Sequence, residues 1–252
     1  MAVHYLRTIL GAAIDFVYPR HCQLCGKQTD KQPGQSDSRT GLCESCRQSL
    51  IPPRMRSCDR CGAPVGPYLD TDQGCIYCRR DTFAFESVIR LGVYEGPLKF
   101  ACLRMKNEHG SGLAAACARL MYDESTEAIR SVNADCVVPI PPHWTGRLRR
   151  IDNPAETIAS RLAARLQVPI CRRILRKVRR TPKQTSISAK KRRTNLRNAF
   201  RASIPKRIHG GTVLLVDDVL TTGTTAHEAA LELKKRGASR VVVAVLARGI
   251  GQ

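Results

Sequence analysis

From about residue 83 onward, short aliphatic runs alternate with segments of helical periodicity. The β-rich runs are Ser87–Tyr94, Ala134–Ile140, Thr212–Val216 and Arg240–Ala247, and the helical segments are Gly112–Arg130, Pro154–Leu166 and Ala226–Arg236. Strands that alternate with helices predict a parallel sheet covered on both faces. Val213–Val216 and Val241–Leu246 are almost purely aliphatic, as expected of central strands buried on two sides. Ligands of such folds bind at the carboxyl ends of the strands.

The first third of the chain has a different pattern. Apolar residues recur at helical spacing between Val3 and Val17, and Pro19 ends this predicted helix before a cysteine-rich stretch begins. We therefore divide the chain into an N-terminal helix (1–20), a cysteine module (21–82) and an α/β module (83–252). The aliphatic strands are expected to form a core separate from the cysteine module.

Eight of the 12 cysteines form four Cys-x-x-Cys pairs with a repeated spacing. The repeat favours two consecutive four-cysteine sites over an interleaved arrangement, and closed thiolate tetrahedra of this kind hold structural zinc. The expected ligands are Cys22, Cys25, Cys43 and Cys46 for one zinc ion and Cys58, Cys61, Cys75 and Cys78 for the other. Gly26 and Gly62 follow two of the pairs and suit a turn with positive φ. The isolated Cys102, Cys117, Cys136 and Cys171 are expected in the apolar core.

Charge is distributed unevenly along the chain. The 252 residues include 42 Lys+Arg and 21 Asp+Glu, a formal net charge of +21, and 42% hydrophobic residues exclude a disordered protein. No acidic residue lies between Glu156 and Asp217, whereas 17 basic residues do. Such a run favours binding of a polyanion, either the phosphates of a small substrate or a nucleic acid. At 5% aromatic residues, platforms for base stacking are not evident.

No apolar run near the start is long enough to cross a bilayer, and no secretion signal is recognisable. The longest uncharged apolar stretch there, Thr8–Ile14, lies between two charged residues. We therefore expect no membrane insertion and a cytoplasmic location.

The segment Val213–Thr225 combines a buried strand, two carboxylates and a turn rich in threonine. Its last part can bind a phosphate through hydroxyls and free backbone N–H groups at the start of a helix. The expected phosphate ligands are Thr221, Thr222, Gly223, Thr224 and Thr225. Asp217 and Asp218 follow the predicted strand and suit the hydroxyls of a ribose, directly or through Mg²⁺. The adjacent carboxylates are expected to repel each other, and a Cβ at residue 223 is expected to block the approach of a phosphate.

This segment resembles the phosphoribosyl pyrophosphate (PRPP) signature of type I phosphoribosyltransferases. With the cysteine module, the chain is similar over nearly its whole length to the ComF family of competence-associated, phosphoribosyltransferase-like proteins. The likeness extends to Pro139-Ile-Pro-Pro-His143 and to a basic hood loop with Gln184–Ser188, Arg192, Asn195 and Ala199-Phe200. The chain departs from the family after the proline loop. It has Arg150-Ile-Asp-Asn-Pro154, where the family usually has Arg-Gly-aromatic-Asn-Gln.

The resemblance implies a type I phosphoribosyltransferase fold, a parallel sheet flanked by helices and topped by a hood, preceded by a double zinc ribbon. It implies PRPP binding with Mg²⁺, with Asp217 and Asp218 as the catalytic pair on the ribose and the threonine turn on the 5-phosphate. Candidates for the pyrophosphate and the hood are Lys106, Arg147, Arg149, Arg150, Asn153, Lys183, Gln184 and Arg192.

Two functions remain open from the sequence. The first is a Mg²⁺-dependent phosphoribosyltransferase whose acceptor the sequence does not identify, linked through the family to competence and DNA uptake. The second is a non-catalytic zinc-ribbon protein of transformation or recombination that binds single-stranded nucleic acid and keeps the PRPP site as a sensor or vestige. The expected partners are PRPP or another small molecule containing ribose 5-phosphate, single-stranded DNA, and proteins of DNA uptake or recombination.

Overall fold

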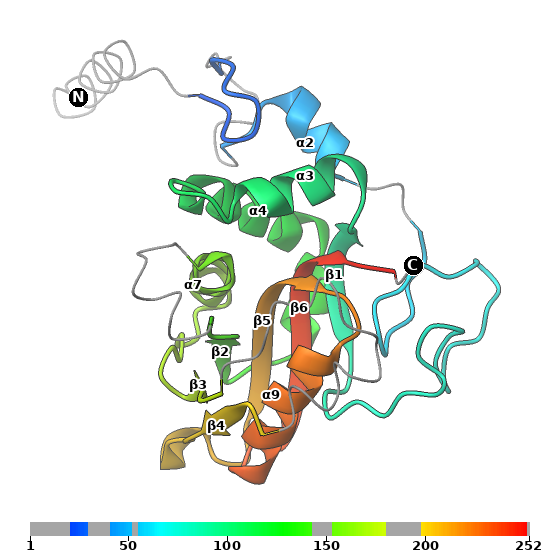
Figure 1. Cartoon of the computed structure of the whole chain (residues 1–252), viewed down its shortest axis with the longest axis vertical. Coiled ribbons are helices and arrows are strands. Elements are labelled where there is room, and N and C mark those ends of the chain that lie inside the picture. Colours follow the sequence, from blue (N-terminus) through cyan, green and yellow to red (C-terminus); the bar gives the residue numbers. More distant parts are fainter. Residues whose placement is uncertain (1–20, 30–40, 52–54, 143–152, 180–197, 251–252) are drawn as a thin grey trace, which may run out of the picture.

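A computed structural model of the chain describes residues 21–29, 41–51, 55–142, 153–179 and 198–250 (Figure 1). The helix expected at Val3–Val17 lies outside the described residues. The described elements are, in order, α2 (Glu44–Leu50), β1 (Val88–Val93), α3 (Gly96–Arg104), α4 (Ser111–Glu124), α5 (Thr126–Ser131), β2 (Cys136–Pro139), α7 (Pro154–Leu166), β3 (Leu175–Lys177), β4 (Phe200–Ala202), the 3-10 turn η3 (Lys206–Ile208), β5 (Thr212–Leu220), α9 (Thr224–Lys235) and β6 (Arg240–Arg248).

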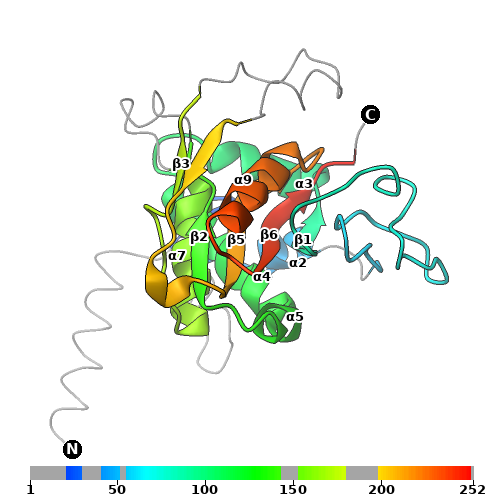
Figure 2. The ribbon, with the colours of Figure 1, turned by 90° about the horizontal axis from the view of Figure 1, so that it is seen from below.

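Four strands form a parallel sheet in the order β1-β6-β5-β2 (Figure 2). All three neighbouring pairs run parallel, with register partners such as Val88 and Val243 or Thr212 and Arg240. Val213–Val216 of β5 and the valines and leucine of β6 are fully buried, because helices or other strands cover both faces of these inner strands. The predicted parallel sheet is confirmed.

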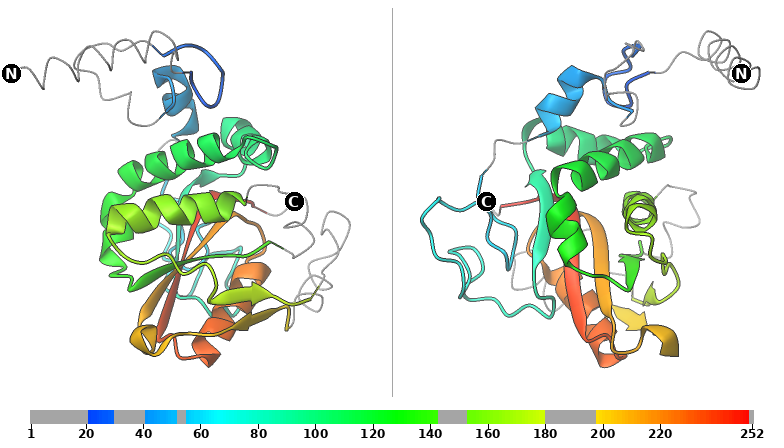
Figure 3. Two further views of the ribbon diagram at one scale, coloured as in Figure 1. Left: turned by 90° about the vertical axis from the view of Figure 1, so that its left-hand side faces the viewer. Right: turned by 180° about the vertical axis from the view of Figure 1, so that it is seen from behind.

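Helices cover both faces of the sheet (Figure 3). Side chains alternate along β5. Leu214 and Val216 belong to the apolar cluster that includes α3, α4 and α7. Val213 and Leu215 belong to the cluster on the other face, with α9 and the antiparallel pair β3-β4. The pair β3-β4 flanks residues 180–197, where the hood loop was expected, and these residues lie outside the described part of the chain.

The helix predicted over Gly112–Arg130 is wrong in one respect, because it is two helices. Ser125 separates α4 from α5 with a non-helical backbone, φ −127° and ψ 28°. The Thr126 hydroxyl donates a 2.6 Å hydrogen bond to the Tyr122 carbonyl, so a side chain satisfies an acceptor at the end of α4. Apolar periodicity continues across the break and does not reveal it.

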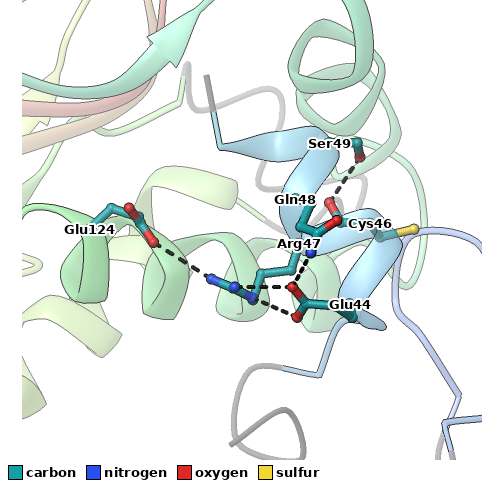
Figure 4. A network of polar contacts seen from close by, with 6 residues as sticks. All are labelled: Glu44, Cys46, Arg47, Gln48, Ser49 and Glu124. Carbon is teal, nitrogen blue, oxygen red and sulfur yellow. Dashed lines mark hydrogen bonds and ion pairs between the residues drawn. The ribbon is translucent and has the colours of Figure 1, made fainter. Parts of the chain in front are cut away.

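The first half of the cysteine module, which contains Cys22, Cys25, Cys43 and Cys46 and is called the first ribbon below, packs on the α/β module. Leu24, Leu42 and Leu50 belong to the same buried cluster as α3, α4 and the sheet. The expectation of a separate core is therefore wrong for this ribbon, since so small a ribbon does not bury its apolar side chains by itself. Arg47 of α2 forms a bidentate contact with Glu44 and lies 3.7 Å from the Glu124 carboxylate of α4 (Figure 4).

The second half of the cysteine module, which contains Cys58, Cys61, Cys75 and Cys78 and is called the second ribbon below, lies beside β1, at the edge of the sheet (Figures 1 and 2). Its small core contains the four cysteines with Ala63 and Val65, and Phe83 packs against it. The Val88 N–H donates a 2.8 Å hydrogen bond to the Asp59 carbonyl, so this module also satisfies part of the outer edge of β1. Among the described helices, none is long and apolar enough to cross a membrane.

Candidate functional site

The eight paired cysteines form two separate clusters, Cys22/Cys25/Cys43/Cys46 and Cys58/Cys61/Cys75/Cys78. Within each cluster, all four sulfur atoms lie within 4.8 Å of one another. Individual Sγ–Sγ distances are 3.7 Å for Cys25–Cys43 and 3.6 to 3.9 Å for three pairs in the second cluster. A tetrahedral zinc with Zn–S bonds of about 2.3 Å requires sulfur atoms about 3.8 Å apart. The donor sets fit zinc, and the clusters are consecutive rather than interleaved.

Backbone turns support both clusters. Gly26 and Gly62 have φ of 75° and 69°, the left-handed conformation expected from their positions after a cysteine pair. None of the twelve cysteines, all of which are described, is in a disulfide. Of the isolated ones, Cys102, Cys117 and Cys136 are fully buried, as predicted, and Cys171 is half-buried.

The predicted phosphate turn links β5 to α9. Gly223 has φ 74° and precedes the first residue of α9, so only a residue without Cβ adopts this turn readily. The helix begins at Thr224, two residues earlier than predicted. The hydroxyls of Thr222 and Thr224 lie 2.9 Å apart, at the amino end of the helix, where backbone N–H groups lack partners within the helix. This arrangement suits an anion.

Asp217 and Asp218 lie within β5, whereas the sequence placed them after it. The strand continues to Leu220 because β6 pairs with it along its whole length. On the other side, β2 pairs with β5 only as far as Val216. Beyond that residue, no described strand pairs with this side of β5. As whole residues the two aspartates are only partly buried, although the side chain of Asp218 is just 13% exposed.

The two carboxylates have different surroundings. The Lys106 ammonium lies 2.7 Å from Oδ2 of Asp218, and the Asp218 N–H donates a 2.9 Å hydrogen bond to Oδ1 of Asp217. Burial, and then the charge of Asp218, raise the pKa of the Asp217 carboxyl well above its ordinary value. Burial alone would lower the pKa of Lys106, but Asp218 and then Asp217 outweigh burial, so this pKa is raised. The expected repulsion between the two carboxylates therefore shows itself in the raised pKa of Asp217.

Two residues of this region were not found from the sequence. The charge of Asp217 acts on Lys177, the last residue of β3, whose pKa burial nevertheless lowers. Burial also raises the pKa of the Tyr94 hydroxyl, which feels the charges of Lys106, Cys102 and Asp218. Lys177 is one of many basic residues in its run, and Tyr94 ends a predicted strand. Neither has a local pattern that distinguishes it.

A cavity of about 270 Å³ lies beside the phosphate turn. One wall is the chain leaving the second ribbon, and the other is the turn and the start of α9. The lining residues are Arg80, Asp81, Thr82, Phe83, Thr222, Thr224, His227 and Glu228. His227 Nδ1 accepts a 3.0 Å hydrogen bond from the Ala84 N–H, which joins the two walls.

A side chain introduced at residue 223 would not point where we expected, toward a bound phosphate. A Cβ there would lie 3.0 Å from the Phe83 ring, which stacks on Phe85 at 4.6 Å. A substitution at Gly223 would therefore first press on the aromatic pair rather than on a bound phosphate.

The structure brings Lys106, Asp217 and Asp218 together at the carboxyl end of β5, next to the threonine turn. Asn153 precedes α7, and its amide donates to the Ile140 carbonyl at 3.4 Å, near the end of β2. The other pyrophosphate and hood candidates lie outside the described residues. These are Arg147, Arg149, Arg150, Lys183, Gln184 and Arg192.

Two protein families match the chain. The double zinc ribbon domain matches residues 13–82, and the phosphoribosyl transferase domain matches residues 151–252. Competence protein F of Haemophilus influenzae is 30% identical over 84% of this chain and 92% of that protein. DNA utilization protein YhgH of Salmonella typhi is 33% identical over the same shares of the two chains. Among solved structures, a purine phosphoribosyltransferase from Pyrococcus horikoshii Ot3 matches with a TM-score of 0.31 at 20% identity, over 50% of this chain and 70% of that one.

The two sequence relatives each match 84% of this chain and 92% of their own length. The type I phosphoribosyltransferase fold with a preceding double zinc ribbon, inferred from the sequence, is confirmed. The chain belongs to the ComF family of competence-associated, phosphoribosyltransferase-like proteins.

Proposed function

We propose that this protein binds PRPP together with Mg²⁺ at the carboxyl end of β5 and acts in the handling of DNA. The observation that carries the proposal is the junction of β5 and α9. There, two carboxylates, one of them paired with Lys106, precede a turn whose glycine has φ 74°. The names of the relatives, a competence protein and a DNA utilization protein, support the link to DNA.

Each group has a role in this proposal. The threonine turn and the start of α9 bind the 5-phosphate, since N–H groups and hydroxyls converge there. Asp217 and Asp218 accept hydrogen bonds from the ribose hydroxyls. Lys106 is placed to supply positive charge near the anionic ligand once Asp218 turns to the sugar.

The donor set fits a magnesium ion that arrives with PRPP. Carboxylate oxygens are suitable ligands, but one of the two carboxylates is already paired with Lys106, and Mg²⁺ is commonly bound by one or two carboxylates plus substrate phosphates. When bound, Mg²⁺ would add positive charge at the pyrophosphate.

A transferase of this kind breaks the bond between ribose C1 and pyrophosphate. The electron pair of that bond leaves with the pyrophosphate oxygen, and an acceptor atom forms the new bond to C1. The residues of the chain stabilise the departing charge and need no protein nucleophile. We propose this chemistry for the chain, with the acceptor left open.

Calorimetry with PRPP tests the proposal. Wild-type protein is expected to bind PRPP in Mg²⁺ and to lose binding in EDTA. Asp218→Asn removes a charge-assisted hydrogen bond, worth about 1.5–3 kcal/mol, so the affinity should fall about 10- to 150-fold. Asp135→Asn is the matched control, because Asp135 accepts from the Thr212 N–H at the opposite end of β5. Absence of Mg²⁺-dependent PRPP binding by wild-type protein would contradict the proposal.

A second candidate function, non-catalytic binding of single-stranded nucleic acid, has an observation of its own. Arg176 of β3 and Arg201 of β4 are register partners, and both are exposed. Like charges directly opposite each other destabilise an antiparallel pair. Among the described residues, neither arginine forms an ion pair with a carboxylate. A phosphate backbone would supply the missing negative charge.

A further inference from the structure

The guanidinium of Arg248, at the end of β6, connects the second zinc cluster to the phosphate turn. The side chain is only 5% exposed. Its Nε donates a 2.7 Å hydrogen bond to the carbonyl of Cys61, one of the four sulfur ligands. Its Nη1 donates to the carbonyls of Leu220, Thr221 and Gly249. One buried cation therefore bonds both to a zinc-ligand residue and to the first residues of the turn.

The charges around Arg248 make this connection dependent on zinc. Arg90 lies against Gly62, next to the zinc ligand Cys61, and the positive charge of Arg248 acts on it. Among the described residues, Nε of Arg90 is buried without a hydrogen-bond partner. A zinc ion held by four thiolates has a net charge of about −2 and can balance the buried Arg248 and the half-buried Arg90. Loss of the metal ion would also release Cys61 from the cluster, and with it the carbonyl to which Arg248 donates.

Two further contacts join the same parts of the molecule. The Phe83 ring lies against Gly223, as the 3.0 Å separation of a Cβ built there indicates. The Ala84 N–H donates to His227 Nδ1 in the first turns of α9. Phe83 packs on the core of the second ribbon and also lines the cavity beside the turn. The segment that follows the second ribbon thus contacts the phosphate turn and the start of α9 through Phe83 and Ala84.

We propose that Arg248 is a positioning residue that ties the phosphate turn to the second zinc cluster, so that the affinity of the turn for a phosphorylated ligand depends on zinc at Cys58, Cys61, Cys75 and Cys78. The affinity part rests on the proposed PRPP site. The mechanical part does not, because the hydrogen bonds of Arg248 exist without a ligand. Zinc in the first ribbon has no such connection with the turn among the described residues.

Amide hydrogen exchange of residues 219–226 tests the connection without any ligand. Arg248→Lys keeps one positive charge but lacks the planar fork that reaches several carbonyls. We expect faster exchange in the turn of this variant. The matched control is Arg240→Lys on the same strand, where Arg240 bonds to Glu86 and to the Val132 carbonyl. The control should exchange in the turn like wild-type protein.

Substitution of one zinc ligand in each cluster distinguishes the effects of the two zinc ions on the turn. Cys78→Ser should accelerate exchange in the turn beyond exchange in the rest of the sheet, whereas Cys46→Ser should show no such excess in the turn, with zinc content measured for both. If Arg248→Lys does not fold, Phe83→Ala replaces it, since that change keeps every zinc ligand and Arg248. It should also accelerate exchange.

PRPP affinity provides the second measurement. Misplacement of binding groups by about 1 Å can cost about 100-fold in catalysis, so a reduction of about tenfold in affinity is expected for Arg248→Lys and Cys78→Ser. Wild-type exchange and affinity in Arg248→Lys, or in Phe83→Ala where that variant replaces it, would overturn the inference. If wild-type protein binds no PRPP, the proposed function fails, and the exchange measurement alone decides the connection.

Discussion

Adjacent residues of the same type can differ in function when their surroundings differ. Asp218 forms an ion pair with Lys106 at 2.7 Å, whereas burial and the charge of Asp218 raise the pKa of Asp217. The sequence predicted two equivalent carboxylates in mutual repulsion. The structure concentrates the repulsion on Asp217, because among the described residues only Asp218 has a cation within ion-pair distance. Their substitutions should therefore affect stability in opposite directions.

Asp217→Asn should stabilise the free protein at neutral pH. A carboxyl whose pKa is raised in the folded state binds its proton more tightly there than in the unfolded chain. Its unfavourable effect is absent below the unfolded pKa of about 3.9 and grows as pH rises toward the folded pKa. Melting temperatures from pH 4 to 8 should show a gain for the variant that increases with pH. A gain that is equal at all pH values would contradict the assignment.

Gly223→Ala should destabilise the protein through two effects. A residue with Cβ pays about 1–2 kcal/mol for the left-handed conformation, and the new methyl group would also press on Phe83. Gly210→Ala is the matched control, because Gly210 also has a positive φ of 79°, but a Cβ added there would have no atom within 4 Å. Urea unfolding of both variants separates backbone strain from contact with the ring. Equal destabilisation of the two variants would show that Phe83 yields without cost.

At the scale of elements, the sequence predicts regular segments well and their limits less well. α7 has the predicted bounds, because Pro154 starts it and its apolar stripe is regular. β5 is longer than predicted, since pairing with β6 extends it through two charged residues. α2, β3 and β4 are too short to give a periodic signal. Their positions depend on packing against distant segments, which no local pattern encodes.

The same limit applies to the site. The turn Thr221–Thr225 and the metal ligands follow from spacing within the sequence. Arg248, Lys177 and Phe83 do not, because each acts through a neighbour that is far away in the chain. In the sequence, Arg248 follows an aliphatic run, and this local pattern predicts only a polar residue at the end of a strand.

The exposed face of β3-β4 should contribute to nucleic-acid binding if the chain binds DNA. Replacing Arg176 and Arg201 together with Gln should reduce the slope of log affinity against log salt for single strands by about 0.7 for each phosphate that is no longer neutralised. Lys234→Gln with Lys235→Gln removes the same charge at the exposed end of α9 and serves as control. Fluorescence anisotropy at several salt concentrations measures both. An equal change in the two variants would indicate an effect of net charge alone.

At the scale of the whole molecule, the zinc ribbons contribute to one structure in two ways. The first shares its apolar core with α3 and α4, and the second is joined to the sheet edge and to the phosphate turn. Metal is therefore expected to stabilise the entire chain rather than a detached module.

Purified protein should contain two equivalents of zinc, and removal of the first zinc ion should lower the melting temperature of the whole protein. In Cys25→Ser, the ribbon that presents Leu24 and Leu42 to the common core loses a metal ligand. Elemental analysis and calorimetry of the variant measure zinc content and cooperativity. One equivalent or none in wild-type protein would contradict the two sites, and an unchanged melting temperature of the variant would contradict the shared core.

The order of strands in the sheet has a consequence for how the chain acquires its structure. β6 is the last of the four strands in sequence, yet it lies between β1 and β5. During synthesis, β1 lacks its partner strand in the sheet until β6 has left the ribosome, although α3 and α4, which pack on it, are made directly after it. Folding of the sheet is therefore a late, long-range event of the slow kind that parallel topologies impose. A nascent chain of this protein depends on protection from aggregation until its final strand is made.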